Sequence, residues 1–157
     1  MHIYFANGLF SRADYDFNAR LVKRLRLASE ALDIYLPQEN AAINDKNAYA
    51  DSTMIAQADT AEVLRSDLMV AILDGPVIDA GVASEIGVAY AKQIPIFGLY
   101  TDSRQQGAMN PQKLTALQNV AENQFHYLNL YTTGLIKLNG EIFNSEEDLI
   151  KAVLAKA

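Results

Sequence analysis

The 157 residues, half of them hydrophobic, are enough for one domain spanning residues 1–157 with a substantial core. A formal net charge of −6 without a basic run disfavours nucleic acid or an acidic membrane as a partner, so we expect a small-molecule substrate. The chain lacks cysteine, and its two histidines, His2 and His126, lie far apart, so we expect neither a metal site nor a cofactor. No signal peptide and no bilayer-length apolar stretch is recognised, which predicts a cytoplasmic protein.

Short apolar strands alternate with amphipathic helices along the chain. We predict strands at residues 2–6, 33–37, 68–73, 94–100 and 134–138, the last from a poorly alternating segment. We predict helices that begin near Ser11, at Ser52 or Thr53, near Asp79, at Pro111 and after Ser145. The polar stretch 38–49 lacks any period and is expected to be a functional loop.

This alternation is typical of an α/β fold with a doubly wound, five-stranded parallel sheet and helices on both faces. If the strand order is 2-1-3-4-5, as in flavodoxin-like and Rossmann-like folds, the winding reverses between the first and third strands. Ligands bind outside the carboxyl ends of the strands at such a point. The site is therefore expected between residues 4–8 and residues 74–79.

The third strand and the helix after it carry the strongest candidate for catalysis. Asp79 is a favoured N-cap, and helical spacing places Val82, Ile86, Ala89 and Gln93 on the inward face. Glu85 then lies at the rim of the core, and Gly81, one turn earlier, leaves it accessible to a small molecule. The helix N-terminus is expected to help keep this carboxylate ionised, as a nucleophile requires. A solvated Glu85 and a purely capping Asp79 are the structural alternative.

Other residues are ambiguous on the sequence alone. Tyr4 is either a core aromatic or a hydroxyl donor to Glu85. Asp59, near the middle of a helix and without a basic partner, indicates a site more than a structural role. Ser11 and Arg12 open a helix that could bind an anion, although a plain cap and a solvated arginine explain them better. The chain has no G-x-G-x-x-G after its first strand, which disfavours dinucleotide binding.

In chain order, these residues resemble the nucleoside 2-deoxyribosyltransferase family over most of the sequence. The matching elements are Ile3-Tyr4-Phe5 with Gly8 and Phe10, then Asp59, then Asp79-x-Gly81-x-x-x-Glu85-x-Gly87-x-Ala89, then Asn129-Leu130-Tyr131-x-x-Gly134. The third element is the most specific of them.

The resemblance implies a retaining transfer of the 2-deoxyribosyl group between nucleobases, with Glu85 as the nucleophile and Tyr4 as its hydrogen-bonding partner. Asp59 and Asp79 would hold the sugar or the base and help protonate the leaving nitrogen, with the division between them open. Asn129 would reach the sugar 5′-hydroxyl from a neighbouring subunit. The partners implied are nucleosides, free nucleobases and further copies of the chain, in a dimer-based assembly or a hexamer.

Four further residues complete the predicted substrate-binding set, namely Gly8, Gly81, Gln38 and Asn40, the last two as contacts to the base. The main alternative function is an N-glycosidase that hydrolyses 2′-deoxynucleoside 5′-monophosphates with the same glutamate, using Ser11 and Arg12 for the phosphate. A nucleoside-binding protein without turnover is a third possibility. The joint presence of the four catalytic candidates argues against it.

Overall fold

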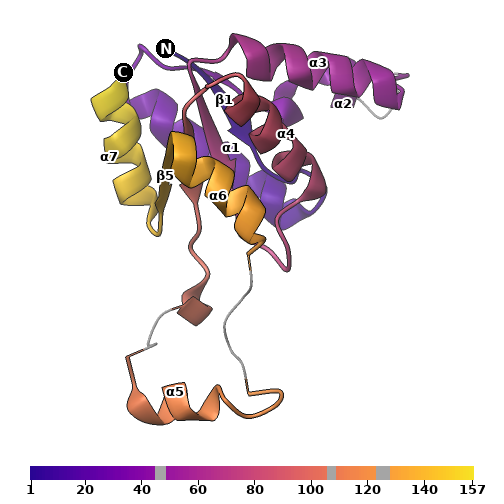
Figure 1. The fold of residues 1–157 in the computed structure, drawn as a ribbon. Coiled ribbons are helices and arrows are strands. Elements are labelled where there is room, and N and C mark those ends of the chain that lie inside the picture. Colours follow the sequence, from indigo (N-terminus) through magenta and orange to yellow (C-terminus); the bar gives the residue numbers. More distant parts are fainter. Residues whose placement is uncertain (45–48, 106–108, 123–127) are drawn as a thin grey trace.

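The computed structural model describes residues 1–44, 49–105, 109–122 and 128–157. Within these ranges, five strands form one sheet in the order β2-β1-β3-β4-β5, and every neighbouring pair is parallel. The strands are β1 (His2–Ala6), β2 (Asp33–Tyr35), β3 (Leu68–Ile72), β4 (Ile96–Leu99) and β5 (Gly140–Phe143) (Figure 1). The predicted parallel sheet and its strand order are confirmed.

Helices cover both faces of this sheet and bury a separate apolar core on each. One face carries α1 (Arg12–Ala28) and α7 (Glu146–Lys156), and the other carries α3 (Ser52–Arg65), α4 (Ala80–Ala91) and α6 (Leu130–Asn139). Strand β3 lies between the two cores with all five residues buried, which explains its continuous apolar sequence. The fold is therefore doubly wound, as predicted.

The helix starts follow the capping signals of the sequence. Ser11 caps α1 in a complete capping box with Asp14, and Asp79 and Ser145 cap α4 and α7 as predicted. Helix α3 begins at Ser52, but its cap is the preceding Asp51, which accepts a hydrogen bond from the Met54 amide. A carboxylate one residue earlier can reach the free amides of the first turn, which the prediction overlooked.

The segments between these elements contain short helices. The stretch predicted as an irregular loop forms a 3₁₀ turn, η1 (Pro37–Glu39), and one helical turn, α2 (Ala41–Asn44). A second 3₁₀ turn, η2 (Ser103–Gln105), follows β4. Helix α5 (Pro111–Ala116) starts at the predicted proline, and Figure 1 shows it away from the two helical layers.

The predicted fifth strand at residues 134–138 is wrong, because this segment belongs to α6 and the strand, β5, covers residues 140–143. A parallel β4 and β5 require a crossover between them, and α6 provides it. Helix α6 ends at Asn139 and β5 begins at Gly140, so the two elements join directly. A Cβ at Gly140 would lie 1.8 Å from the Ile96 carbonyl oxygen, so only glycine fits where β5 meets β4.

Helix α4 ends at Ala91, two residues before the last predicted inward position, Gln93. Val82, Ile86 and Ala89 are buried as expected, but Gln93 lies beyond the helix end, is exposed and has a φ of 59°. The chain reverses there, and the Ile94 amide donates to the Ala89 carbonyl to close the helix. Gln93 therefore does not belong to the inward column.

Candidate active site

Two adjoining recesses open at the carboxyl edge of the sheet, on the face covered by α3 and α4. The larger, about 360 Å³, lies between these helices, and the smaller, about 200 Å³, lies under the β1–α1 loop and η1. They share Ile55, Asp59, Gly81 and Glu85 in their linings. The two recesses therefore meet at a pair of carboxylates from different helices, beside the point where the winding reverses.

Glu85 projects from the second turn of α4 toward the end of β1. The Tyr4 hydroxyl, on a fully buried side chain, donates a 2.6 Å hydrogen bond to Glu85 Oε1. Burial raises the pKa of Tyr4, so its hydroxyl remains a proton donor. The hydrogen bond predicted between these two residues is present, and it fixes the orientation of the carboxylate.

Burial also raises the pKa of Glu85 from 4.5 to about 7. The hydrogen bond from Tyr4 lowers the pKa, but the neighbouring charges of Asp59 and Asp79 raise it further. We had expected the helix N-terminus to keep this carboxylate ionised, and the cost of burial outweighs that effect. Glu85 therefore holds its proton to a higher pH than an ordinary glutamate.

Asp59 faces the same space from the middle of α3. Its side chain is half-buried, burial raises its pKa, and its Oδ1 atom is buried without a hydrogen-bond partner among the described residues. A buried polar atom without a partner costs free energy, and a bound ligand with a hydroxyl or N–H group would satisfy it. Asp59 therefore indicates a ligand site more than a structural role.

Asp79 joins the site from the N-terminus of α4. Its Oδ1 accepts hydrogen bonds from the Gly81 amide (2.8 Å) and the Val82 amide (3.2 Å), so the helix cap fixes the carboxylate. Its Oδ2 lies 3.9 Å from the point where a Cβ at Gly8 would stand. A Cβ at Gly81 would lie 3.0 Å from Oδ1. Gly81 thus keeps space open around this carboxylate, whereas a Cβ at Gly8 would make ordinary van der Waals contact with it.

The loop after β1 is held by a buried amide network that sequence reasoning missed. Asn18, on α1, accepts from Asn7 Nδ2 (2.6 Å) and donates to the Gly8 carbonyl and to Gln38 Oε1 (both 3.0 Å). Gln38 in turn donates to the Tyr15 carbonyl (3.1 Å). The amide of Gln38, predicted to contact the base, thus bonds within the fold, and Gln38 lines neither recess.

Two other predicted residues lie outside the recess linings. Asn40 donates from Nδ2 to the Tyr35 hydroxyl (2.9 Å). Asn129 caps α6 by accepting from the Thr132 amide (3.1 Å), and its side chain is exposed. Neither recess of this one chain includes Asn129.

The walls of the recesses are mainly apolar and were not predicted. Ile55, Val63 and Val88 line the larger recess, and Leu9, Phe10 and Ile43 line the smaller. Such walls suit a flat aromatic ligand, whereas the two carboxylates suit its polar substituents. Helical spacing of Ile55, Asp59 and Val63 on α3 could have identified one wall.

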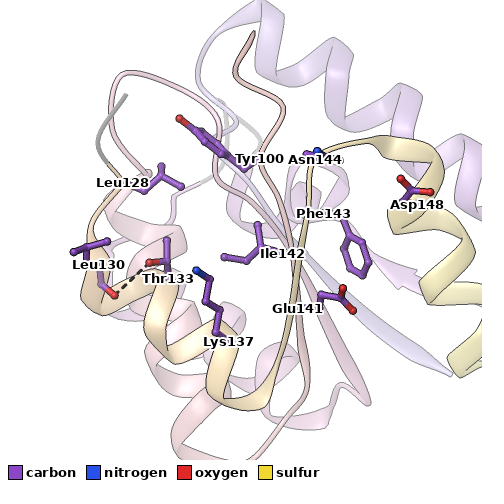
Figure 2. A pocket seen from close by; sticks show the side chains of 10 residues that line it. All are labelled: Tyr100, Leu128, Leu130, Thr133, Lys137, Glu141, Ile142, Phe143, Asn144 and Asp148. Atoms are coloured by element: carbon purple, nitrogen blue, oxygen red, sulfur yellow. Dashed lines mark hydrogen bonds between the residues drawn. The ribbon is translucent and has the colours of Figure 1, made fainter. Parts of the chain in front are cut away.

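The largest recess among the described residues, about 900 Å³, lies elsewhere, around the exposed edge strand β5. In Figure 2, Thr133 and Lys137 lie on the α6 side of β5, whereas Asp148 lies on the α7 side. Its polar groups are therefore spread over two faces of the sheet. The predicted catalytic residues are all absent from its lining.

In the part of the chain that the structure describes, every helix is too short or too polar to cross a membrane. The described residues also contain no group of three or more histidine, aspartate or glutamate side chains that could hold a metal ion. His126 lies outside the described residues.

A buried, tyrosine-bonded carboxylate beside a second acid and an apolar recess is an arrangement that can carry out glycosyl transfer. The chain belongs to the nucleoside 2-deoxyribosyltransferase family, whose sequence profile matches residues 3–130. This family acts on nucleosides and nucleobases. No curated protein sequence matches the chain.

Solved structures share the fold. A conserved protein from Enterococcus faecalis V583 has a TM-score of 0.95 and 68% sequence identity, covering 100% of this chain and 99% of that one. A 2-desoxiribosyltransferase from Leishmania mexicana has a TM-score of 0.66 and 17% identity, covering 98% and 97% of the two chains. A CMP N-glycosidase from Clostridium botulinum has a TM-score of 0.52 and 14% identity, covering 100% of both. The last two, at low identity, support the fold alone.

Proposed function

We propose that this protein, acting in the cytoplasm as one domain over residues 1–157, transfers the 2-deoxyribosyl group between nucleobases by a retaining double displacement. The observation that carries the proposal is the hydrogen bond from Tyr4 to Glu85 at the junction of the two recesses, opposite the unpartnered Oδ1 of Asp59. It rests also on membership of a family that acts on nucleosides and nucleobases.

In the first step, a Glu85 carboxylate oxygen forms a bond to the anomeric carbon of a 2′-deoxynucleoside while the bond from that carbon to the base nitrogen breaks. The electron pair of the broken bond leaves with the base, which takes up a proton. Asp59, whose pKa is raised by burial, and Asp79 are the carboxyl groups near enough to supply it. The tyrosine hydrogen bond keeps the nucleophile aimed at the sugar.

In the second step, a nitrogen of the incoming base attacks the anomeric carbon and the ester bond to Glu85 breaks. The new base loses its proton to the acid that served the first step, so protons and charges balance. Each step inverts the anomeric centre, and the two inversions give net retention. The ionised glutamate is then ready for another cycle.

The apolar recess favours transfer over hydrolysis. The larger recess is walled by Ile55, Val63 and Val88, which offer little to hold an attacking water and a broad surface for a base. A seated base therefore displaces water from the ester that Glu85 forms. This is the physical reason for a transferase.

The alternative is hydrolysis of a nucleoside 5′-monophosphate, the activity named for the Clostridium botulinum relative. It would need a phosphate contact, for which Ser11 and Arg12 were the sequence candidates. Ser11 is engaged in the capping box with Asp14, and Arg12 pairs with Asp16 at 2.9 Å. Because both candidates are engaged within α1, the structure favours a substrate with a free 5′-hydroxyl.

We also propose a homo-oligomer, dimer-based or hexameric, in which Asn129 completes the site of a neighbouring subunit. The outer face of α6 supports this, because Leu130, Tyr131 and Leu138 are 85%, 77% and 72% exposed. Gly134, between them, would let a partner helix approach closely. Asn129, at the start of this helix, would then lie at the subunit boundary.

One experiment separates the candidates. The protein is incubated with 2′-deoxyinosine and free adenine, and in parallel with a 2′-deoxynucleoside 5′-monophosphate alone, and the products are separated by chromatography. We expect 2′-deoxyadenosine in the first reaction and no release of base in the second. Base release from the monophosphate without nucleoside exchange would favour the hydrolase, and no product in either would refute both enzymatic functions.

A further inference from the structure

Asn18 is a buried amide on the inward face of α1, where the neighbouring residues are apolar. Leu21, Val22 and Leu25, one and two turns later, are fully buried, and Asn18 itself is only 1% exposed. An aliphatic side chain at this position would pack into the core without needing any polar partner. Packing alone therefore does not account for an asparagine here.

Both N–H groups of the Asn18 side chain are used, and their acceptors lie in two separate segments. Nδ2 donates to the Gly8 carbonyl in the loop between β1 and α1, and to Gln38 Oε1 in η1 (both 3.0 Å). Oδ1 accepts from Asn7 Nδ2 (2.6 Å). Gln38 also donates to the Tyr15 carbonyl on α1. One buried side chain thus ties the β1–α1 loop and η1 to the same turn of α1.

The two segments that Asn18 joins form walls of the smaller recess. Leu9 and Phe10 line this recess from the β1–α1 loop, Pro37 lines it from η1, and α4 contributes Glu85. Asn18 itself is absent from the linings of both recesses. It can therefore act on a ligand only through the segments that it holds.

Asn7 connects the amide network to the recess. Its half-buried side chain belongs to the lining of the smaller recess, where the other polar side chains are the carboxyl groups of Asp59, Asp79 and Glu85. Because Nδ2 donates to Asn18, the group that Asn7 has left is Oδ1, which accepts no hydrogen bond from the described residues. With the carboxyl groups ionised, these side chains all offer acceptors, which suits the hydroxyl donors of a sugar.

We propose that Asn18 is a positioning residue of the smaller recess: it holds the β1–α1 loop and η1 in place as walls, and it fixes the amide of Asn7 so that the oxygen is left to accept from a ligand hydroxyl. Walls that are already ordered cost less free energy when the ligand binds. Loss of Asn18 must weaken binding more than chemistry, because the Tyr4–Glu85 hydrogen bond joins β1 to α4 and does not involve the network. The inference rests on the proposed function only for the identity of the ligand.

The first test measures the walls without a ligand. The side chain in Asn18→Ser is too short to reach both segments, and amide hydrogen exchange reports on η1 through Glu39 and Asn40, whose amides close this turn. We expect these two amides to exchange about tenfold faster, as the loss of a hydrogen bond predicts, while the Leu73 amide, which donates to β4, is unchanged. Equal acceleration at Leu73, or none in η1, would overturn the proposal.

Two further variants complete this test. Gln38→Met removes only the η1 end of the network and should accelerate the same two amides, so it decides the question even if Asn18→Ser does not fold. The control is Asn139→Ser, which removes a 2.7 Å amide hydrogen bond to the Ile94 carbonyl, outside both recesses. An effect of the control on η1 as large as that of Gln38→Met would overturn the proposal.

The second test is the steady-state kinetics of deoxyribosyl transfer. Asn18→Ser and Gln38→Met should raise KM for 2′-deoxyinosine about tenfold and leave kcat within about twofold, because binding lost equally from the ground state and the transition state changes KM alone. A fall in kcat at unchanged KM, or no change in either constant, would overturn the proposal. If the wild-type protein transfers no deoxyribose, the proposed function fails, and hydrogen exchange still decides the role of Asn18.

Discussion

Replacing Glu85 by glutamine should abolish transfer and, at alkaline pH, stabilise the fold. Burial raises the pKa of Glu85 from 4.5 to about 7, so the folded protein holds this proton more tightly than the unfolded chain. The wild-type free energy of unfolding must then fall as the pH rises from about 4.5 to about 7 and stay low above it. The gap corresponds to about 3 kcal/mol, since one pKa unit is worth about 1.4 kcal/mol.

Glutamine is neutral at every pH and can still accept the Tyr4 hydrogen bond, so Glu85→Gln escapes this cost. Urea unfolding followed by circular dichroism at pH 5 and pH 8.5 gives the free energy of unfolding of both proteins. The advantage of the variant should grow by about 2 to 3 kcal/mol between these pH values. The control is Glu30→Gln, the same replacement at an exposed glutamate after α1.

A variant whose advantage is the same at both pH values would refute the assigned burial of the charge. Retained transfer activity in Glu85→Gln would remove the proposed nucleophile. The two readouts are separate, because one reports the free energy of the carboxylate in the fold and the other its chemistry.

Three further results are expected. Tyr4→Phe removes the hydrogen bond that lowers the pKa of Glu85, so the acidic limb of the kcat/KM profile should move to higher pH; an unmoved limb would contradict this. Asn129→Ser retains the helix cap but shortens the side chain, and mixing this inactive or weak variant with Glu85→Gln should restore part of the activity; no recovery despite subunit exchange would exclude shared sites. A ribonucleoside would bury an unpaired 2′-hydroxyl against Gly81 and Glu85, so 2′-deoxyinosine should be favoured over inosine about tenfold to a few hundredfold in kcat/KM, and equal values would refute this account.

The sequence predicted the elements that carry strong local signals. Strand β3 is continuously apolar and α4 has a clear cap at Asp79, so this part of the fold was predicted correctly. The prediction of a strand at residues 134–138 failed because a short apolar run is compatible with a strand or with a helix. The buried positions Thr132, Leu135 and Ile136 have helical spacing, and Asn129 is a cap, so the signal for α6 was present but unrecognised.

The surroundings of Glu85 were predicted less completely, for a physical reason. Glu85 and Asp79 are neighbours on one helix, so local geometry relates them, whereas Tyr35 and Asn18 are held by contacts between distant segments. The raised pKa of Glu85 depends on how many atoms surround it, which no local pattern reports. Tyr4 is the exception: it belongs to a distant segment, but its position on a predicted strand was enough to relate it to Glu85.

The direct junction of α6 and β5 has a consequence for how such chains can diverge. Asn139 Nδ2 donates to the Ile94 carbonyl (2.7 Å), and Gly140 lies against the backbone of β4, so the helix continues into the sheet without a linker. An inserted residue here would rotate α6 about its axis and turn Asn129 in another direction. Insertions and deletions in related chains should therefore accumulate before Asn129 and be absent between Asn129 and Gly140.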